Sequence, residues 1–358
     1  MKSNLVVEFF KTNNYNSIHD TGLSWNEVGE KFNISGEAAR SQWRNHKPDN
    51  MLLKSRWQVQ TKEGIEWLES YKAGSEYLNV TDIQSIINNA FSIPVKFVSK
   101  NIQKSKLTET QIINIADVHL GMDIKEDLFG YEWNKQEYYK RLDVVLQNVN
   151  PNANIIVNQL GDFTDGLNGE TTRGGHKLPQ NMNSKETIQL GVESILYILD
   201  QIDNPVTINW LTNSNHPGVI DYAIGYTLQH ICLYRYNFVT FNLIEDFFYP
   251  IDVNGHTFLL VHGKDDKHMN KGLNRFLNDK EQNMIRNVME NKQLHNVTIL
   301  RSDQHQYADV DYNNFRDIMT PSFANPSAWV QYNFGSSYKG GFTTIEVNQE
   351  LTTKLIKF

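Results

Sequence analysis

The sequence predicts a large α/β domain that follows a small, mainly helical domain. From about residue 109 onward, short apolar runs typical of buried strands alternate with longer amphipathic stretches typical of helices, which is the pattern of an α/β protein. The chain has 358 residues, of which 39% are hydrophobic, enough for a sizeable core. We therefore expect a first domain at 1–75, a linker at 76–108 and a second domain at 109–358.

The predicted first domain begins with two short helices joined by a turn. In the stretch SWNEVGEKFNISGEAARSQWRNHKP, residues 24–48, Ser24 is followed three residues later by Glu27, the signature of a capping box that opens a helix. The NISG sequence at 33–36 supplies turn residues, and Pro48 ends the second helix.

Three more elements are predicted before residue 109. The RWQVQ run at 56–60 predicts a strand, and KEGIEWLESYK at 62–72 predicts a helix. The sequence TDIQSIINNAF at 81–91 predicts an amphipathic helix, and a polar, Lys-rich stretch follows it. We interpret this last part as a linker that contains one short helix.

The second of the two short helices carries a basic face. Arg40, Arg44 and Lys47 recur at the i, i+4, i+7 spacing of one helix side. The segment resembles a helix-turn-helix, winged in form, and this resemblance implies that the second helix and its three basic residues bind a groove of DNA. The alternative is a small helical domain with a solvated basic stripe, which binds protein or no partner.

Composition limits the other classes of function. The net charge of −7 argues against a grip on nucleic acid by the whole surface. Residues 1–110 hold 14 Lys and Arg against 12 Asp and Glu, whereas the remainder holds 20 against 29, so the acidic excess lies in the second domain. The sequence shows no run of about 18 apolar residues and no leader pattern, so we expect no membrane span and no secretion. The single cysteine, Cys232, fits a core position in a cytoplasmic protein.

Five predicted strands of the second domain end in Asp, His or Asn. In α/β sheets, the carboxyl ends of the strands form the edge at which ligands bind. The polar residues at these ends are Asp117 and His119, Asp162 and Asp165, Asn215 and His216, His262, and finally Asp303 and His305.

These residue types indicate a metal centre. Carboxylate and amide oxygens together with imidazole nitrogens, without thiolates, suit Mn²⁺, Fe or Zn²⁺ better than Ca²⁺ or a soft metal. The candidates are too many for one ion, and two neighbouring metals bridged by a carboxylate would use them all.

The series D-x-H, G-D-x-x-D, N-H, H-G and x-x-H resembles the calcineurin-like metallophosphoesterase superfamily. The resemblance spans roughly 110–350, and ADVHLG is similar to the first motif of the DNA-repair exonuclease branch. It implies a two-sheet αββα sandwich that hydrolyses phosphate esters with two divalent metals, Mn²⁺ foremost and Fe, Zn²⁺ or Mg²⁺ as alternatives. By position, the resemblance assigns Asp117, His119 and His305 to the first metal, Asp162 to a bridge, Asn215 and His262 to the second metal, and His216 to phosphate contact and protonation of the leaving oxygen.

The sequence departs from the family pattern twice. Ser214 and Pro217 flank the third motif, where the family has Gly before Asn-His and Asp or Glu after it. The last motif is normally G-H-x-H, so Asp303 stands where a His is expected to bind the second metal. A carboxylate still binds a cation there and favours harder ions such as Mn²⁺ or Mg²⁺.

The resemblance and the domain pairing together predict a phosphodiesterase that acts on DNA. Two alternatives stay open: a phosphomonoesterase acting on nucleotides or phosphoproteins, and a DNA-binding protein whose metal site is degenerate. The Gly-rich stretch ETTRGGHKLPQ at 170–180 predicts a loop that presents Arg173 and His176 to a phosphate, although an ordinary surface loop fits it equally well. Asp165 reads as a turn residue or as a partner of a ligand.

Overall fold

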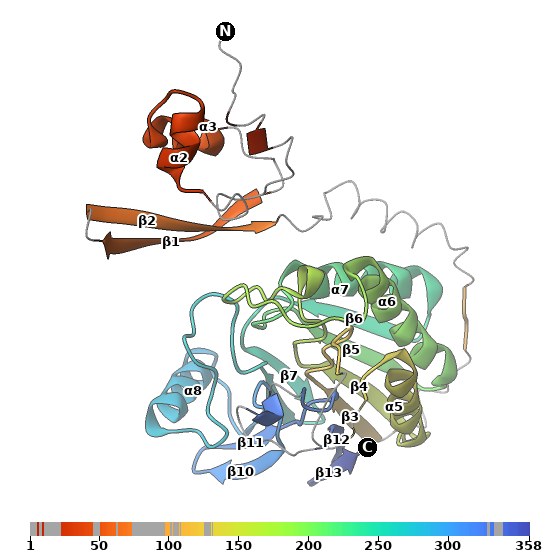
Figure 1. Ribbon diagram of the computed structural model, residues 1–358. Coiled ribbons are helices and arrows are strands. Elements are labelled where there is room, and N and C mark those ends of the chain that lie inside the picture. Colours follow the sequence, from red (N-terminus) through yellow and green to blue (C-terminus); the bar gives the residue numbers. More distant parts are fainter. Residues whose placement is uncertain are drawn as a thin grey trace. The chain divides into compact units, whose positions relative to one another are not determined.

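The computed structural model divides into two compact units, Met1–Ile83 and Gln84–Phe358 (Figure 1). Within the described residues, no helix combines the length and the apolar character needed to cross a bilayer. The predicted helix at 81–91, Lys47 and Pro48 lie outside the described residues. The structure describes residues 6, 9–10, 23–45, 51–61, 64–73, 97–100, 102, 107, 109–124, 130, 132–327, 330–332 and 339–358.

The two predicted short helices of the first unit are present as α2 (Trp25–Lys31) and α3 (Gly36–Asn45). The capping box is formed: Glu27 N–H donates to Ser24 Oγ over 3.3 Å, and Ser24 N–H donates to a Glu27 carboxylate oxygen over 2.6 Å. Apolar side chains from both helices are buried together in a small core, which contains Val6, Phe10, Val28 and Ala39 with Phe9, Leu23, Trp25, Phe32 and Ile34 packed against them.

A β-hairpin follows these helices. Strand β1 (Met51–Thr61) contains the strand predicted at 56–60 and pairs antiparallel with β2 (Gly64–Ala73). The helix predicted at 62–72 is therefore wrong. The apolar residues of this segment fit the spacing of a helix as well as the alternation of a strand. Pairing with β1 decides for the strand, and the local sequence carries no signal of that pairing.

A six-stranded sheet forms one half of the second unit, in the order β13-β12-β3-β4-β5-β6. Strands β3 to β6 are parallel, and β12 is antiparallel to both β3 and β13. The elements are β3 (Glu109–Ile115), β4 (Ala153–Gln159), β5 (Val206–Leu211), β6 (Val239–Ile244), β12 (Gly341–Val347), β13 (Leu351–Lys357) and the helices α5 (Lys135–Gln147), α6 (Ser184–Gln201) and α7 (Val219–Arg235), with a 3-10 turn η3 (Leu167–Gly169).

A five-stranded sheet forms the other half, in the order β10-β11-β9-β8-β7. Asn254 and Gly255, with φ of 51° and 83°, make the hairpin turn between β7 and β8. Helix α8 places Ile285 and Met289 against Leu259 of this sheet. The elements are β7 (Tyr249–Val253), β8 (His256–Leu260), β9 (Val297–Arg301), β10 (Ala308–Tyr312), β11 (Phe315–Met319) and α8 (Asp279–Asn291).

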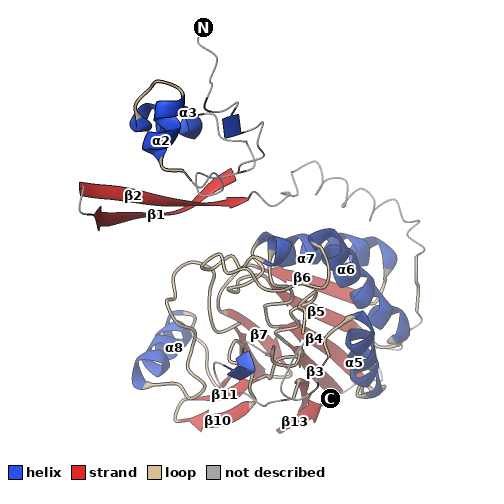
Figure 2. Cartoon of the chain, viewed as in Figure 1, coloured by secondary structure: helices blue, strands red, loops and turns tan. Residues whose placement is uncertain are grey.

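The two sheets face each other across the main hydrophobic core, with helices on the outer faces (Figure 2). The second unit is thus the mixed α/β, two-sheet architecture expected from the sequence. Its inter-sheet core contains Ile112, Ala116, Leu160, Leu211 and Ile244 from one sheet side, and Phe258, Leu260, Leu300 and Ile318 from the other.

A ladder of asparagines fixes the register of the parallel strands. Asn114, Asn158, Asn209 and Asn242 stand opposite one another on β3 to β6. Each side-chain amide donates to the carbonyl of the preceding residue in the ladder over 2.8–2.9 Å, and Asn114 donates to Thr343 Oγ1 over 3.1 Å. Because side chains alternate along a strand, the ladder lies on the inter-sheet face with the core residues. Its fixed register aligns the ends of these strands.

Candidate metal centre

Parallel pairing continues beyond the ends of β3 and β4, and this brings the first two motifs side by side. Asp117 N–H donates to Gly161 O over 3.1 Å, and His119 N–H donates to Asp162 O over 3.2 Å. Gly161 has φ of 101°, and a Cβ at this position would lie 2.6 Å from His262 Nδ1. A glycine is therefore required at position 161, where the first two motifs lie against His262 of the fourth motif.

Strained backbone is concentrated at the predicted ligands. Non-glycine residues rarely adopt the left-handed region, and each such residue costs about 1–3 kcal/mol unless its surroundings hold it there. Five of the predicted ligands adopt φ between 46° and 72°: Asp117, His119, Asp162, Asp303 and His305.

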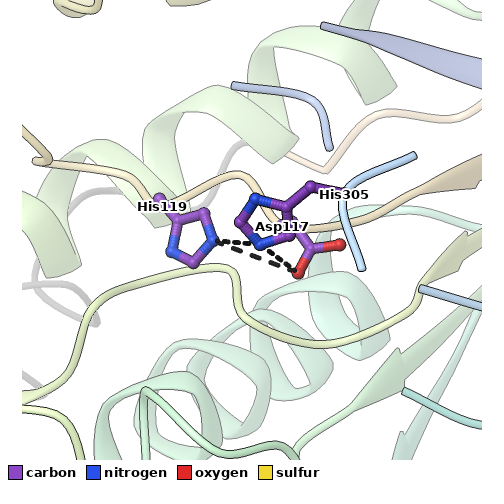
Figure 3. A group of neighbouring side chains, drawn as sticks. All are labelled: Asp117, His119 and His305. Carbon is purple, nitrogen blue, oxygen red and sulfur yellow. Dashed lines mark hydrogen bonds and ion pairs between the residues drawn. The ribbon is translucent and has the colours of Figure 1, made fainter. Parts of the chain in front are cut away.

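The first ligand set consists of Asp117, His119 and His305 (Figure 3). The Nε2 atoms of His119 and His305 face each other at 3.3 Å, and His305 Nε2 lies 3.4 Å from Asp117 Oδ1. His119 Nδ1 lies 2.7 Å from Asp165 Oδ1, so the carboxylate holds the proton on Nδ1 and leaves the Nε2 lone pair directed into the set.

The carboxylate of Asp117 meets the main test for a metal site. Asp117 is fully buried, and neither carboxylate oxygen accepts a hydrogen bond from the described residues. Burial raises the pKa of this carboxyl, but the neighbouring His305 and His262 together lower it below its usual value. A buried, ionised carboxylate without hydrogen-bond donors is costly, and a bound cation removes that cost. The residues present therefore fit a divalent metal.

The second set is made of the residues predicted for the second metal, Asp162, Asn215, His262 and Asp303, and two of them, Asp162 and His262, form with Asp117 a group that could hold a metal ion. His262 Nε2 lies 3.2 Å from Asp162 Oδ2 and 3.2 Å from Asn215 Oδ1. It also lies 3.9 Å from Asp303 Oδ1. The opposite nitrogen, His262 Nδ1, lies 2.8 Å from Leu160 O, which fixes the ring with Nε2 facing the oxygens.

The carboxylates around His262 favour a positive charge at its Nε2 atom. Burial lowers the pKa of His262, but Asp162 and Asp117 raise it, with a net rise to about 10. A proton on Nε2 satisfies these oxygens, and a metal ion bound at the same place satisfies them as well. Metal binding at this set should therefore displace a proton.

Asp165 organises the exposed edge of the centre. Its Oδ1 lies 2.7 Å from His119 Nδ1 and 3.2 Å from His216 Nδ1, and its Oδ2 accepts a hydrogen bond from Gln180 Nε2 over 2.8 Å. His216 keeps 24% of its side chain exposed and places Nε2 3.9 Å from Asp162 Oδ2. Burial lowers the pKa of His216, but Asp162 and Asp165 raise it to about 9, so this imidazole is protonated at neutral pH.

The predicted loop at 170–180 is attached to the third motif. Thr172 N–H donates to His216 O over 2.8 Å, and Arg173 N–H donates to Asn215 O over 3.0 Å. The Arg173 guanidinium lies 3.7 Å from Asp265 Oδ1. The loop thus brings Arg173 to the rim of the centre, whereas His176 is exposed to solvent.

The predicted basic face of the first unit is described only in part. Arg40 lies on α3 with a half-buried side chain. The side chain of Arg44, and Lys47 as a whole, lie outside the described residues. Cys232 is buried on α7, where burial raises its pKa to about 12, in agreement with the predicted core position.

Several residues that support the centre carry no signal in the sequence. Each is a common polar or aromatic residue whose partner is distant in the chain, so only the fold identifies it. Two of them stand beside predicted ligands: Ser214 Oγ accepts the Asp162 N–H over 3.0 Å, and Ser302 Oγ lies 2.9 Å from His262 Nδ1. The others are Ser322 and Trp133, which donate to the backbone carbonyls of Asp117 and His119, and Asp221, which accepts from Phe163 N–H and Thr164 Oγ1.

No protein-family model and no curated protein matches the sequence. Solved structures similar to the chain include a novel archaeal phosphodiesterase, with 11% identity, coverage of 69% of this chain and 100% of that one, and a TM-score of 0.37. The phosphoesterase Yfce from E. coli has 11% identity, coverage of 69% and 100%, and a TM-score of 0.36. Zinc-bound Vps29 from Entamoeba histolytica has 11% identity, coverage of 69% and 99%, and a TM-score of 0.33. At these values, similarity alone does not assign an activity to this chain.

Proposed function

We propose that this protein is a two-metal phosphoesterase, and that its substrate is a phosphodiester of DNA. The observation that carries the proposal is the buried Asp117 carboxylate, which accepts no hydrogen bond from the described residues and lies among imidazole nitrogens that face inward. Beside it lies a second set of oxygens around His262, and a protonated histidine stands at the exposed edge.

Each ligand set would hold one divalent cation, Mn²⁺ in the first instance. Asp117, His119 and His305 would hold the first, and Asp162 would contribute to both. When bound, such a pair supplies Lewis-acid stabilisation of the phosphoryl oxygens and lowers the pKa of a water molecule toward about 7. The remaining ligands of the second cation are Asn215, His262 and Asp303.

His216 is the proposed general acid. Its Nδ1 is held by Asp165, so Nε2 points toward the centre with a proton that is retained at neutral pH. A proton donor at this position can transfer its proton to the leaving oxygen, and such general acid catalysis contributes about 10²–10⁴-fold to a rate.

Arg173 is the proposed phosphate-binding residue of the 170–180 loop. Asp265, its carboxylate neighbour, already accepts hydrogen bonds from the backbone of His268 and Met269. The 3.7 Å separation from Arg173 is therefore a loose ion pair, which leaves the guanidinium able to bind a phosphoryl oxygen. His176, which is exposed, is assigned a weaker contact with the same substrate.

DNA is the preferred substrate because of the first unit. Two short helices joined by a turn, with Arg40 on the second, support a DNA-binding role, while the acidic excess of the second unit argues against DNA binding by the catalytic surface alone. A phosphomonoesterase is the alternative, since both reactions use the same metal chemistry.

The experiment compares wild type with His216→Ala on four substrates: single-stranded DNA, double-stranded DNA, a small aryl diester and an aryl monoester, each with Mn²⁺. We expect DNA and diester cleavage by wild type, and a fall in kcat of about 10²–10⁴-fold in the variant. His295→Ala, at an exposed histidine beyond α8, is the matched control. Circular dichroism and metal content establish that each variant is folded and loaded.

Unchanged cleavage by His216→Ala would remove the assigned acid. Activity confined to the monoester would replace the DNA substrate by the alternative. Absence of all four activities in a protein that binds two metal ions would contradict the enzymatic proposal itself.

A further inference from the structure

Phe276, in the loop between β8 and α8, is a large apolar side chain that faces solvent. It is 61% exposed, whereas Leu273 and Leu277 of the same loop are buried in the core beneath α8. A single exposed apolar side chain is common and means nothing by itself. What sets Phe276 apart is how firmly its backbone is held and which groups surround it.

The backbone on both sides of Phe276 is fixed by side chains of the five-stranded sheet. Arg301 is fully buried at the end of β9, and its Nη2 atom donates to the carbonyls of Asn274 and Arg275 over 2.9 and 2.8 Å. The backbone N–H that follows Phe276 donates to the Tyr312 hydroxyl over 2.8 Å. A ring carried on such an anchored segment loses little conformational freedom when a ligand binds it, which favours binding.

The segment that carries Phe276 borders the metal centre. Leu273 N–H donates to Gly263 O over 2.9 Å, directly after the fourth motif. A Cβ at Gly272 would collide with the Asp303 carboxylate, so these two residues lie against each other. Four residues of extended chain span at most about 14 Å, so Phe276 lies within that distance of Gly272, beside the second ligand set.

The guanidinium of Arg275 lies beside both Phe276 and the loop of the last motif. It is 5.2 Å from the centroid of the Phe276 ring, and its Nη2 atom donates to Tyr307 O over 3.1 Å, two residues after His305. Residues 263–277 carry four Lys and Arg against two Asp, whereas the second unit as a whole carries 24 Lys and Arg against 30 Asp and Glu. The loop is therefore a local basic surface on an acidic unit, and it attracts anions.

The size of this surface fits a nucleotide better than a protein. Between residues 262 and 319, all of which the structure describes, no other large apolar side chain is as exposed as Phe276. A stable protein interface covers about 800 Å² on each partner and is built around several aromatic or apolar residues. One ring is enough to stack on one base, and a guanidinium beside it is well suited to bind a phosphate.

We propose that Phe276 and Arg275 form a nucleotide subsite beside the metal centre, in which the ring stacks on an unpaired base and the guanidinium binds the adjoining phosphate. Stacking requires that one face of the base be uncovered, so the subsite favours single-stranded or frayed DNA over a closed duplex, whose bases are covered on both faces. The inference rests on the proposed phosphodiesterase function and specifies the form of its substrate.

The first test measures stacking without hydrolysis, on the full chain with Mg²⁺. The probe is the 5′-methylenephosphonate of 2-aminopurine deoxyriboside, which carries one base and one anionic phosphoryl group but no ester bond to cleave. Its fluorescence falls when the base stacks. We expect wild type to quench the probe, and Phe276→Ala to abolish the quenching and to weaken binding by about 5- to 150-fold. Phe276→Tyr, which keeps a ring, should retain both.

Arg275→Gln separates the phosphate contact from the stack. It should weaken binding of the probe, while the quenching at saturation stays as in wild type. Phe97→Ala is the matched control, because Phe97 is 59% exposed and precedes Val98, which pairs with Tyr236 at the opposite, amino-terminal end of the parallel strands. This control should bind the probe as wild type does. Thermal unfolding of each variant confirms that the fold is kept.

The second test measures cleavage with Mn²⁺. It compares a thymidine dinucleotide with the two dinucleotides that lack one base or the other. Wild type should cleave the intact compound with a higher kcat/KM than one of the two abasic compounds. Phe276→Ala should lose this preference and still cleave that abasic compound at the wild-type rate, because only the contact with the base is removed.

Equal quenching and equal affinity in wild type and Phe276→Ala, both of them folded, would overturn the subsite. An unchanged preference for the intact dinucleotide in Phe276→Ala would also overturn it, while leaving the phosphodiesterase function in place. Quenching that depends on Phe276, in a protein that cleaves no dinucleotide, would instead support the subsite and contradict the proposed function.

Discussion

At the scale of single residues, Asp165 connects the two functional parts of the centre. One carboxylate holds His119, a proposed metal ligand, and His216, the proposed acid, through the same oxygen. Gln180 binds the other oxygen and prevents the carboxylate from turning. Carboxylates that fix the tautomer of a ligating histidine raise its basicity and its affinity for the metal.

Asp165→Asn tests this connection with a side chain of equal size. An Asn carbonyl in place of Oδ1 can still accept from both Nδ1–H groups, but the negative charge is lost and the Asn amide would face the Gln180 Nε2 donor, so both rings are held less firmly. We expect metal affinity or kcat to fall by about 10–100-fold, with little change in the melting temperature. Asp143→Asn, at a carboxylate that accepts from Tyr197 Oη in the outer helix layer, is the control. Wild-type metal binding and kcat in Asp165→Asn would show that the shared carboxylate has no such role.

The sequence alone brings out the residues that carry chemistry and misses those that position them. Asp117, His119 and His305 are visible because they interrupt apolar strand patterns, and the structure brings one ligand atom of each within 4.8 Å of the others. Ser214 and Ser302 stand next to predicted ligands in the chain, but only the fold shows what each of them contacts. A polar side chain whose partner lies dozens of residues away has no periodic signature.

At the scale of elements, the asparagine ladder holds the strands that deliver the ligands. Three of its members are fully or almost fully buried, and hydrogen bonds between neighbours satisfy their amides. A shift of one residue in any pairing would turn each side chain to the opposite face of the sheet, and the amide groups would lose their partners. The ladder therefore fixes the register on which the centre depends.

Asn158→Leu should be strongly destabilising, although leucine has nearly the same size. The variant leaves Asn114 Oδ1 without a donor and Asn209 Nδ2 without an acceptor. Each buried group without a partner should lower the free energy of unfolding by about 1–3 kcal/mol. Urea unfolding of both proteins measures the difference in the free energy of unfolding. Asn242→Leu, at the half-buried end of the ladder, removes the hydrogen-bond partner of only one group, Asn209 Oδ1. Its free energy of unfolding should fall by about half as much. Equal losses in the two variants would show that the ladder does not act as a connected network.

Elements with local signals were predicted well, and those decided by distant pairing were not. The two short helices α2 and α3, predicted from a capping box and from the turn residues between them, depend on neighbouring residues only. Strand β2 was predicted as a helix because the spacing of its own apolar residues does not show that it pairs with β1. The same limit applies to the order of strands in the two sheets, which no local pattern encodes.

At the scale of the whole molecule, the acidic excess lies mainly in the second unit. Residues 1–83 carry 10 Lys and Arg against 11 Asp and Glu, whereas residues 84–358 carry 24 against 30. Long DNA should therefore be repelled by the unit that holds the metal centre and attracted by the basic helix of the other. Small phosphodiesters, which do not span both units, should be indifferent to this division.

Binding of the full chain to a DNA duplex should accordingly depend steeply on salt, and Arg40→Gln should reduce that dependence. Each phosphate contact releases counterions, so loss of one contact lowers the slope of log K against log salt by about 1. Fluorescence anisotropy at several salt concentrations measures the slope. Lys140→Gln, at an exposed lysine of α5, removes the same charge from the second unit and should leave the slope unchanged.

If Arg40→Gln binds DNA as wild type does, the basic helix is not the DNA contact. If Arg40→Gln loses DNA affinity and still cleaves the small diester at the wild-type rate, DNA recognition and catalysis reside in different units of the chain.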